Sequence, residues 1–274
     1  MVPNLIIPGA AKSGTSSLHE YLNLHPEIEM SRVKEPHFFT HNDRYNEGLK
    51  FYDNLFNNEN AKYWGESSTA YFVDTLALKR IKKELRSVKF IVILRDPVMR
   101  AASHYRWQVG LFEEFRSFRK AVRHNINNPV SFRKPGLGGH FKSYYEESLY
   151  GDKLHYLINE FGKENIYLIT SKELKLDANA SLKGCFEFLE LSPITISVEM
   201  KANSTKHLPG RIGKLRSFLA KAIRRGVLDF RLLYLAVNDN VGKVTKDDMA
   251  WLRNILEDDI KLLQKYYPDI AERW

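Results

Sequence analysis

The segment "KFIVIL" at residues 89–94 is an almost unbroken apolar run, and it constrains the fold more than any other part of the chain. A strand with one face in water alternates apolar and polar side chains, whereas a strand covered on both faces is apolar throughout. Strands of the second kind occur almost only in parallel sheets that carry helices on both faces. The segment therefore predicts a central strand of an α/β sheet.

Other apolar runs alternate with segments of helical spacing. We predict further strands at 4–7, 62–66 and 165–170, with helices after each run and a long final helix beginning near Thr245, where Thr245 and Asp248 resemble a capping box. Gly162 is expected to close the helix before the strand at 165–170. This alternation, without an internal repeat, predicts an α/β fold: a single P-loop-type domain over residues 1–274 with a central, mostly parallel β-sheet flanked by helices. Its core would cover residues 4–191, followed by a basic segment and the long helix within 192–274.

The charge balance favours anionic partners without identifying them. The chain has 42 basic and 33 acidic residues and a net charge of +9, which suits nucleic acid, acidic polysaccharide, anionic lipid or phosphorylated cofactors. The single cysteine, Cys185, excludes an internal disulfide and fits a small core residue. We see no signal peptide, because the first apolar run is too short, and we expect a cytoplasmic protein.

The stretch "GAAKSGTSSL" at 9–18 has the features of an anion-binding loop. It lies between a predicted strand and a predicted helix, where backbone N–H groups and the positive helix end attract an anion. An ATP-binding loop needs a lysine directly after its second glycine, and this chain has Thr15 there. The lysine comes earlier in the loop instead. The predicted anion ligands are Lys12, Ser13, Gly14, Thr15 and Ser16.

A second strand-to-helix junction, "FIVILRDPVMRAASHY", repeats this arrangement, and Asp96 can cap its helix. Arg95 follows the strand and can bind a phosphate through two hydrogen bonds, and Ser103 lies about two turns into the next helix. The alternative is that Arg95 pairs with Asp96 or another carboxylate. Together, the two junctions fit a nucleotide with a 5′ group and a separate 3′-phosphate.

With these two motifs, the sequence resembles the sulfotransferases that use 3′-phosphoadenosine 5′-phosphosulfate (PAPS), especially the branch of the heparan sulfate N- and 3-O-sulfotransferases and their bacterial relatives. "GAAKSGTSSL" is similar to that family's 5′-phosphosulfate loop and "FIVILRDPVMRAASHY" to its 3′-phosphate motif. "KEPHFF" (34–39) and "GESSTAYF" (65–72) follow in the family's order. The similarity is strong from residue 4 to about 110 and moderate to about 191.

The resemblance implies sulfuryl transfer from PAPS to a hydroxyl or amine, with PAP (3′-phosphoadenosine 5′-phosphate) as product. Lys12 would stabilise the leaving 5′-phosphate, as the electrostatics of an in-line displacement also require. Glu35 matches the family's general base, for which a moderately raised pKa would be suitable. His37 matches an active-site histidine. The alternative is that "KEPHFF" forms a surface turn in which Lys34 and Glu35 are merely solvated. We predict no metal, since no histidine pair has a persuasive ligand set.

Two residues depart from the pattern of the heparan sulfate enzymes. Ser67 stands where those enzymes commonly have lysine, and Thr40 where they tend to have an acidic residue. Both positions concern the acceptor. The acceptor class therefore stays open among glycans, glycolipids and small alcohols, with carbohydrate favoured and no nucleic acid expected.

Two acid-free basic stretches have no single interpretation. The first is either a cleft for an acidic glycan, with aromatic side chains that stack on sugar rings, or a solvated surface loop. Its residues are Arg116, Arg119, Lys120, Arg123, Arg133, Lys134 and Lys142, with Phe118, Phe132, Phe141 and Tyr144 between them. The second stretch, 201–228, contains Arg211 and Lys214 as further cofactor-binding candidates, because the family often closes its cofactor site with a late basic loop. The first interpretation of residues 211–228 is an exposed helix with no partner, and they also suit peripheral membrane contact.

Two other functions are weighed against sulfuryl transfer. A P-loop kinase or NTPase would need magnesium and ATP, and it lacks its lysine here. A non-catalytic module for polyanions would bind with steep salt dependence and without preference for a 3′-phosphate.

Overall fold

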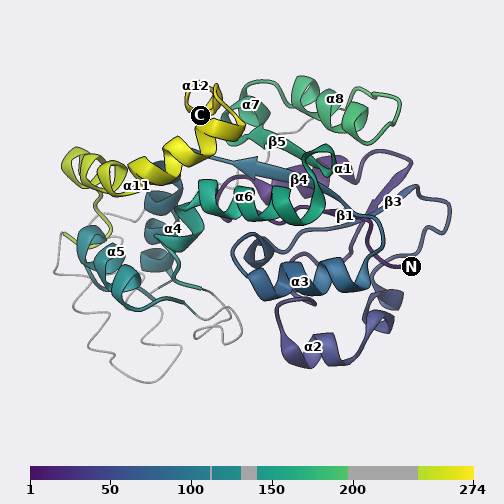
Figure 1. The fold of residues 1–274 in the computed structure, drawn as a ribbon, viewed down its shortest axis with the longest axis horizontal. Helices are drawn as coiled ribbons and strands as arrows, with labels where there is room; N and C mark the ends of the chain where they lie inside the picture. Colours follow the sequence, from purple (N-terminus) through teal and green to yellow (C-terminus); the bar gives the residue numbers. More distant parts are fainter. Residues whose placement is uncertain (112, 131–140, 197–239) are drawn as a thin grey trace, which may run out of the picture.

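The computed structural model describes residues 1–111, 113–130, 141–196 and 240–274. Within them, a five-stranded, all-parallel sheet has the strand order β2-β3-β1-β4-β5 (Figure 1). The strands are β1 (Leu5–Ile6), β2 (Ile28–Met30), β3 (Tyr63–Glu66), β4 (Lys89–Leu94) and β5 (Ile166–Thr170). The predicted α/β fold with a parallel sheet is confirmed.

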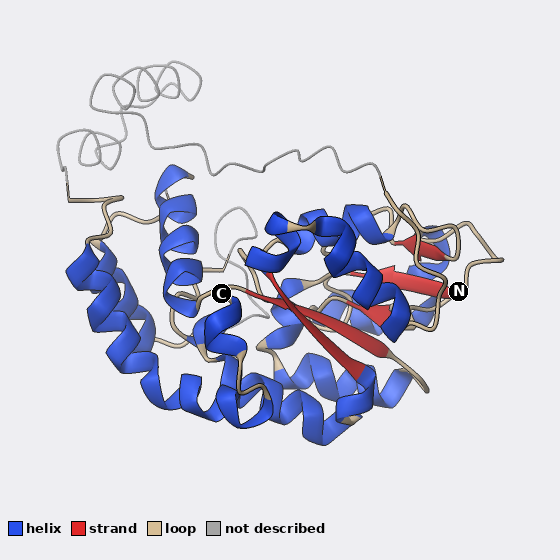
Figure 2. Cartoon of the chain, turned by 90° about the horizontal axis from the view of Figure 1, so that it is seen from above, coloured by secondary structure: helices blue, strands red, loops and turns tan. Residues whose placement is uncertain are grey.

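Helices cover both faces of this sheet, as Figure 2 shows from above. The helices among the described residues are α1 (Thr15–Leu22), α2 (Asn42–Asn46), α3 (Thr75–Glu84), α4 (Pro97–Gly110), α5 (Phe118–Asn127), α6 (Tyr150–Phe161), α7 (Ser171–Leu176), α8 (Ala178–Phe188), α11 (Lys246–Tyr266) and α12 (Ile270–Arg273). Short 3-10 turns lie at Leu49–Asn54, Thr69–Phe72, Glu146–Ser148 and Lys163–Asn165.

Strand β4 is buried on both sides, as its apolar run predicts. Phe90, Val92 and Leu94 pack into a core with residues of α3 and α6. Ile91 and Ile93 point to the opposite face, into a second core with residues of α1, α7 and α8. The predicted core residue Cys185 belongs to this second core and is fully buried.

A third core lies outside the sheet, between α4, α5 and α11. Tyr105 of α4 packs against Phe118 of α5, with ring centroids 5.2 Å apart. The sequence does not predict α5, whose ten residues fall in the first basic stretch, nor the three-residue edge strand β2. The apolar residues of α5 do have helical spacing, at Phe118, Ala121 and Val122, but the sequence argument weighs this segment by its charge. The three residues of β2 are too short a run to show a period.

Local capping residues set several helix ends where the sequence predicts them. The Asp96 carboxylate accepts a hydrogen bond from the Met99 N–H at 2.8 Å, at the start of α4. Thr245 and Asp248 form the predicted capping box of α11. Gly162 follows the last residue of α6 in the left-handed region, with φ 81°. These caps supply partners to N–H and C=O groups that a helix end would otherwise leave unpaired.

Helix α11 packs directly on the start of α6. Both carboxylate oxygens of Asp259 accept backbone hydrogen bonds, from Gly151 at 2.9 Å and Asp152 at 3.0 Å. A Cβ atom on Gly151 would lie 2.3 Å from the Asp259 carbonyl oxygen, so only glycine allows this approach. Among the described helices, none is long and apolar enough to span a membrane.

Candidate active site

The two predicted anion loops emerge from neighbouring strands and are joined by their backbones. Beyond the end of β1, the Ala10 N–H donates to the Ile93 carbonyl oxygen at 2.8 Å, and the Ile93 N–H donates to the Gly9 carbonyl oxygen at 2.9 Å. Lys12 and Arg95 each follow these paired residues by two positions. The fold therefore brings both predicted cations to the same edge of the sheet, where ligands of parallel α/β sheets bind.

The first loop turns into α1 through a glycine that no other residue would replace easily. Gly14 is the residue before α1 and has φ 104°, and no side chain caps the helix. The amides of the first turn, from Thr15 onward, are therefore available to an anion. The Ser13 side chain is buried, and its hydroxyl has no hydrogen-bond partner within the described residues. Such an unpaired hydroxyl suits an additional anion oxygen.

Lys12 lies at the centre of the site. Burial lowers the pKa of its ammonium group, the positive charges of Arg95 and Arg100 lower it further, and Glu35 and Glu147 oppose this shift. The Lys12 Nζ lies 4.4 Å from the centroid of the Trp107 ring on α4. Lys12 is thus close enough to the predicted residues Arg95 and Glu35 to be influenced by the charge of each.

Arg95 does not pair with Asp96, the partner that the alternative interpretation gave it. The Asp96 carboxylate is taken by the Met99 N–H and by an ion pair with Arg253 of α11. Burial lowers the pKa of Arg95, Tyr150 and Asp96 oppose this, and Arg106 and Arg100 add to it. Arg95 is partly buried and makes no ion pair with any described carboxylate. This environment favours binding an anion.

Of the remaining predicted cofactor ligands, Ser103 and Ser16 are described by the structure, and the others are not. Ser103 is buried in α4, four residues before Trp107, so both lie on the helix face that meets the Lys12 loop. Ser16 is partly exposed in the first turn of α1. Arg211, Lys214 and the segment 211–228 lie outside the described residues.

The backbone is unusual at all three predicted catalytic residues. Four described residues other than glycine have positive φ, and three of them are Lys12 (67°), Glu35 (55°) and His37 (51°). Side chains disfavour this region, and functional sites are where such conformations gather. The pattern supports a functional role for the loop "KEPHFF" as well as for the first anion loop.

A buried carboxylate holds the "KEPHFF" loop in this conformation. Glu66, at the end of β3, accepts hydrogen bonds from Ser68 at 2.7 Å and from Tyr71 at 3.0 Å. The Ser68 hydroxyl in turn accepts from the His37 N–H at 3.0 Å, and the Tyr71 hydroxyl from the Phe39 N–H at 3.1 Å. Glu66 is fully buried. It escaped the sequence analysis, although its place at the end of a strand is the same signal that identified Arg95.

Glu35 is surrounded by hydrogen-bond donors. His37 Nε2 lies 3.1 Å from one of its carboxylate oxygens, Lys34 Nζ lies 3.2 Å from the other, and the Thr69 hydroxyl lies 3.2 and 3.3 Å from the two. Burial alone would raise the pKa of Glu35, but the bond to His37 and the charge of Lys34 outweigh it and lower the pKa to about 2. The expected moderately raised pKa is therefore wrong: Glu35 is ionised throughout the physiological range.

A second buried ion pair lies behind Lys12. Arg100 is fully buried and donates to Glu147 at 2.9 Å, to Ser148 at 2.9 Å and to the Tyr144 carbonyl oxygen at 2.7 Å. Burial raises the pKa of Glu147 against the pull of Arg100. No sequence motif pointed to Glu147, because it lies far along the chain in an unremarkable acidic pair.

Three of the five described cations of the first basic stretch lie beside carboxylates, whereas the exposed Lys120 and Arg123 form no ion pair with a described carboxylate. Arg119 pairs with Asp247 at 2.6 Å and Asp248 at 3.2 Å, Arg116 pairs with Glu114 at 3.1 Å, and the Lys142 ammonium lies 3.9 Å from Glu113. Phe118 and Tyr144 are each 1% exposed and cannot stack on a sugar ring. The Phe141 ring centroid lies 6.3 Å from that of His37, so this aromatic residue borders the site. Residues 131–140 lie outside the described part.

The two departures from the family pattern are both buried. The Ser67 hydroxyl lies 2.8 Å from His19 Nδ1, and Thr40 lies beneath the "KEPHFF" loop with its hydroxyl unpaired among the described residues. Burial and the charge of Lys34 lower the pKa of His19 to about 4. A lysine at position 67 would repel His19 if protonated, so the serine and the neutral histidine fit each other.

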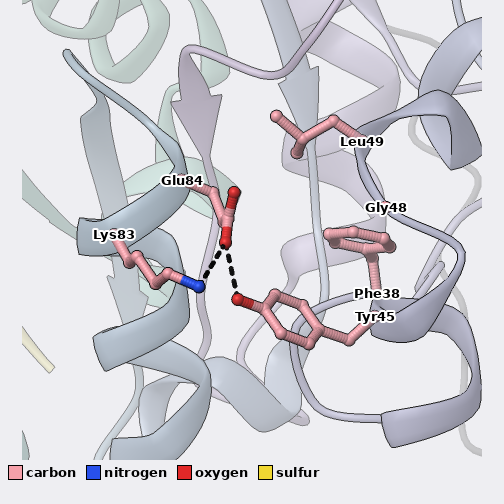
Figure 3. A pocket seen from close by; sticks show the side chains of 6 residues that line it. All are labelled: Phe38, Tyr45, Gly48, Leu49, Lys83 and Glu84. Atoms are coloured by element: carbon pink, nitrogen blue, oxygen red, sulfur yellow. Dashed lines mark hydrogen bonds and ion pairs between the residues drawn. The ribbon is translucent and has the colours of Figure 1, made fainter.

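A small open cavity of about 150 Å³ lies on the other side of this loop. Figure 3 shows Tyr45 pointing across it to Glu84, which Lys83 also approaches from the same helix. It is lined by Phe38, Tyr45, Gly48, Leu49, Lys83 and Glu84, and none of the predicted site residues is among them. Ligand pockets are usually larger. In the described ranges, no group of three or more His, Cys, Asp or Glu residues is arranged to hold a metal ion, and the absence of a metal stays a prediction.

Comparisons with known proteins agree with this geometry. Mouse heparan sulfate glucosamine 3-O-sulfotransferase 3B1 is 28% identical over 91% of this chain and 65% of its own length. Human heparan sulfate glucosamine 3-O-sulfotransferase 5 is 36% identical over 75% of this chain and 58% of its own length. The chain spans about half to two thirds of the length of the first curated relatives.

Solved structures have the same fold. A sulfotransferase from Alicyclobacillus acidocaldarius superposes with a TM-score of 0.62 at 25% identity, over 87% of this chain and 97% of the other. A mouse sulfotransferase complexed with PAP superposes with a TM-score of 0.51 at 18% identity, over 97% and 89% of the two chains. The family model of the sulfotransferase domain matches residues 3–211. With two strand-end anion loops, a parallel sheet and this match over most of its length, the chain belongs to the sulfotransferase family.

Proposed function

We propose that this protein transfers the sulfuryl group of PAPS to a hydroxyl or amine of a carbohydrate acceptor. The observation that carries the proposal is the meeting of two cations, Lys12 and Arg95, at the ends of adjacent strands, where neither pairs with a described carboxylate. A donor with a phosphosulfate at one end and a 3′-phosphate at the other carries two anionic groups, one for each cation.

The residues at the sheet edge fit the donor's charged groups. Lys12, Ser13 and the first-turn amides of α1 would hold the 5′-phosphosulfate, since they combine a cation, an unpaired hydroxyl and an uncapped helix end. Arg95 and Ser103 would hold the 3′-phosphate. The missing lysine after Gly14 argues against ATP as the donor.

The transfer itself is an in-line displacement at sulfur. The acceptor oxygen or nitrogen attacks, a new bond to sulfur forms, and the bond from sulfur to the bridging phosphate oxygen breaks. The acceptor proton passes to Glu35, and the electrons of the broken bond stay on the phosphate of PAP. Lys12 stabilises that growing charge more than it stabilises the bound donor, which is the requirement for catalysis.

The low pKa of Glu35 defines its part in this step. A carboxylate with a pKa of about 2 is always ready to accept, yet it is a weak base towards an alcohol. Glu35 therefore first accepts a hydrogen bond from the acceptor group. It takes the proton late in the step, because the forming bond to sulfur makes the acceptor group more acidic. His37, bonded to the same carboxylate, is placed to orient Glu35 or share the proton.

The names of the relatives favour a glycan acceptor with a glucosamine hydroxyl. Three of the five described cations of the first basic stretch are paired with carboxylates, which reduces the positive charge that this surface offers to a polyanion. A cytoplasmic location, membrane contact through 211–228 and a role for Arg211 and Lys214 stay predictions.

A thermal-shift titration tests the donor assignment. PAP should raise the melting temperature more than AMP, and more than ATP with magnesium. Preference for ATP with magnesium would support the kinase alternative, and equal responses that vanish in salt would support a polyanion-binding module.

An acceptor screen tests the reaction. With ³⁵S-labelled PAPS, label should enter heparan sulfate oligosaccharides in preference to a neutral glycolipid or a small alcohol. Incorporation into the alcohol alone would contradict the carbohydrate assignment.

A further inference from the structure

The ammonium group of Lys12, the predicted leaving-group lysine, lies over an aromatic ring. Lys12 Nζ lies 4.4 Å from the centroid of the Trp107 ring, well within the distance at which a cation is attracted to an indole face. Both residues are partly buried, which strengthens this attraction relative to a solvent-exposed pair. Trp107 is itself supported by His104, one turn earlier on α4, with ring centroids 5.8 Å apart.

Two carboxylates compete for the same ammonium group. The negative charges of Glu35 and Glu147 are both felt at Lys12. Even so, among the described residues no carboxylate oxygen forms an ion pair with Lys12, because each of the two is held by other donors. Glu35 is bonded to Lys34 and His37, and Glu147 is bonded to Arg100.

This difference matters for the proposed reaction. A lysine paired with the general base would neutralise it, and both groups would have to separate before the donor and acceptor could bind. A lysine over a ring keeps its full charge and leaves the carboxylate to the acceptor. The attraction to a ring is also weaker than the attraction to a phosphosulfate, so the donor can take the lysine over.

We propose that Trp107 is a positioning residue that holds Lys12 over its ring and apart from Glu35 until the donor's 5′-phosphosulfate binds. The inference rests on the proposed function, since it assigns Lys12 to the donor. Lys12 has a left-handed backbone, with φ 67°, and its side chain reaches the Trp107 ring on α4.

Tryptophan fluorescence tests this without any acceptor. The chain has four tryptophans, so the contribution of Trp107 is the difference between wild type and Trp107→Phe. PAP should change the emission of wild type as Lys12 leaves the ring, and this change should be lost in Trp107→Phe. Trp251→Phe is the matched control, because that ring stacks with Arg119 and Arg123 away from the site, and it should keep the change.

A Lys12→Met variant distinguishes the effect of the lysine on Trp107 emission from the effect of the donor. Calorimetry confirms that this variant is saturated with PAP. Its Trp107 emission should not respond to PAP. An unchanged response would mean that Trp107 contacts the donor itself, which overturns the proposal, as would PAP binding to wild type with no Trp107 signal. Failure of PAP to bind wild type at all would instead reject the proposed function.

Two substitutions of similar size give the kinetic test. Trp107→Leu removes the ring and should lower kcat about 3- to 30-fold, the range expected for loss of a partly buried cation–π contact. Trp107→Phe keeps a weaker ring and should retain kcat within about threefold of wild type. Equal losses in both variants, at equal melting temperatures, would assign Trp107 to packing alone and overturn the inference.

Discussion

The strand-end cations and the cations of the first basic stretch look alike in the sequence and differ in the structure. Lys12 and Arg95 are partly buried beside other positive groups, and no described carboxylate pairs with them. Arg116, Arg119 and Lys142 lie beside carboxylates from their own segment or from α11. The first set is destabilising by itself and gains from an anion, whereas the second set is already neutralised.

This contrast teaches that an anion site is marked by cations without carboxylate partners rather than by a high density of cations. Placing like charges together costs free energy of folding, and a protein retains such an arrangement where binding compensates it. The run of seven basic residues between 116 and 142 is the more conspicuous signal in the sequence. The structure assigns the described part of it to the packing of α5 against α11.

The largest effect is expected for Glu35, the carboxylate beside the donor-binding cation Lys12, and it should fall on the reaction rather than on donor binding. Glu35→Gln should lower the rate of sulfuryl transfer about 100- to 10,000-fold, because it removes the proton acceptor. PAP affinity, measured by calorimetry, should change less than threefold. Glu20→Gln on the exposed side of α1 is the control and should keep the wild-type rate. Full activity of Glu35→Gln on every acceptor would disprove the base assignment.

Next in size is the direct comparison of the two sets of cations. Arg95→Met should weaken PAP binding about 10- to 100-fold, because charge-assisted hydrogen bonds to phosphate contribute about 1.5–3 kcal/mol each. Arg119→Met should leave the dissociation constant within about twofold, since Asp247 and Asp248 already neutralise that guanidinium. Equal weakening by the two variants would mean that PAP affinity follows net charge, and the contrast would fail.

For the stability of the ligand-free protein we expect a smaller effect, in which Arg119→Met rather than Arg95→Met is the damaging substitution. Without ligand, Arg95→Met should melt at the same temperature as wild type or higher, because it relieves repulsion with Arg100 and Arg106. Arg119→Met should melt slightly lower, because it removes an ion pair and the contact of Arg119 with the Trp251 ring. A destabilised Arg95→Met would show that Arg95 has a structural partner.

The smallest effect concerns acid sensitivity near the donor loop. The pKa of His19 is about 4 in the folded protein against an ordinary 6.5, so the unfolded chain binds more protons between these values. Stability therefore falls as the pH is lowered from 6.5 to 4. His19→Asn, which keeps a partner for Ser67, should show a shallower fall in urea denaturation. An unchanged slope would assign the acid sensitivity to other groups.

Much of the fold follows from local patterns, and the site follows only in part. The apolar run of β4, the Asp96 cap and the capping box at Thr245 are short-range features, and the structure has them where the sequence predicts them. The convergence of Lys12 and Arg95 follows from the rule on parallel strand ends. The support of the "KEPHFF" loop by Glu66, and the position of Trp107 over Lys12, depend on contacts between distant segments.

Electrostatic properties are the part that composition and motifs predict least well. The pKa of Glu35 moves down rather than up because His37 and Lys34 lie on either side of it, and a motif does not reveal whether a neighbour donates to a carboxylate. Likewise, the partners of Arg119 lie more than a hundred residues away. Side-chain pairing of this kind is decided only when the helices pack.

The attachment of α11 to both α4 and α6 has a consequence for protein synthesis. Arg253 pairs with the residue that caps α4, and Asp259 binds the first amides of α6. The ribosome therefore completes every described strand well before it makes the two side chains that secure the helices next to Arg95 and Tyr150. A nascent chain stalled after β5 would hold the whole sheet, yet it should gain nucleotide affinity only after α11 has been translated and has docked.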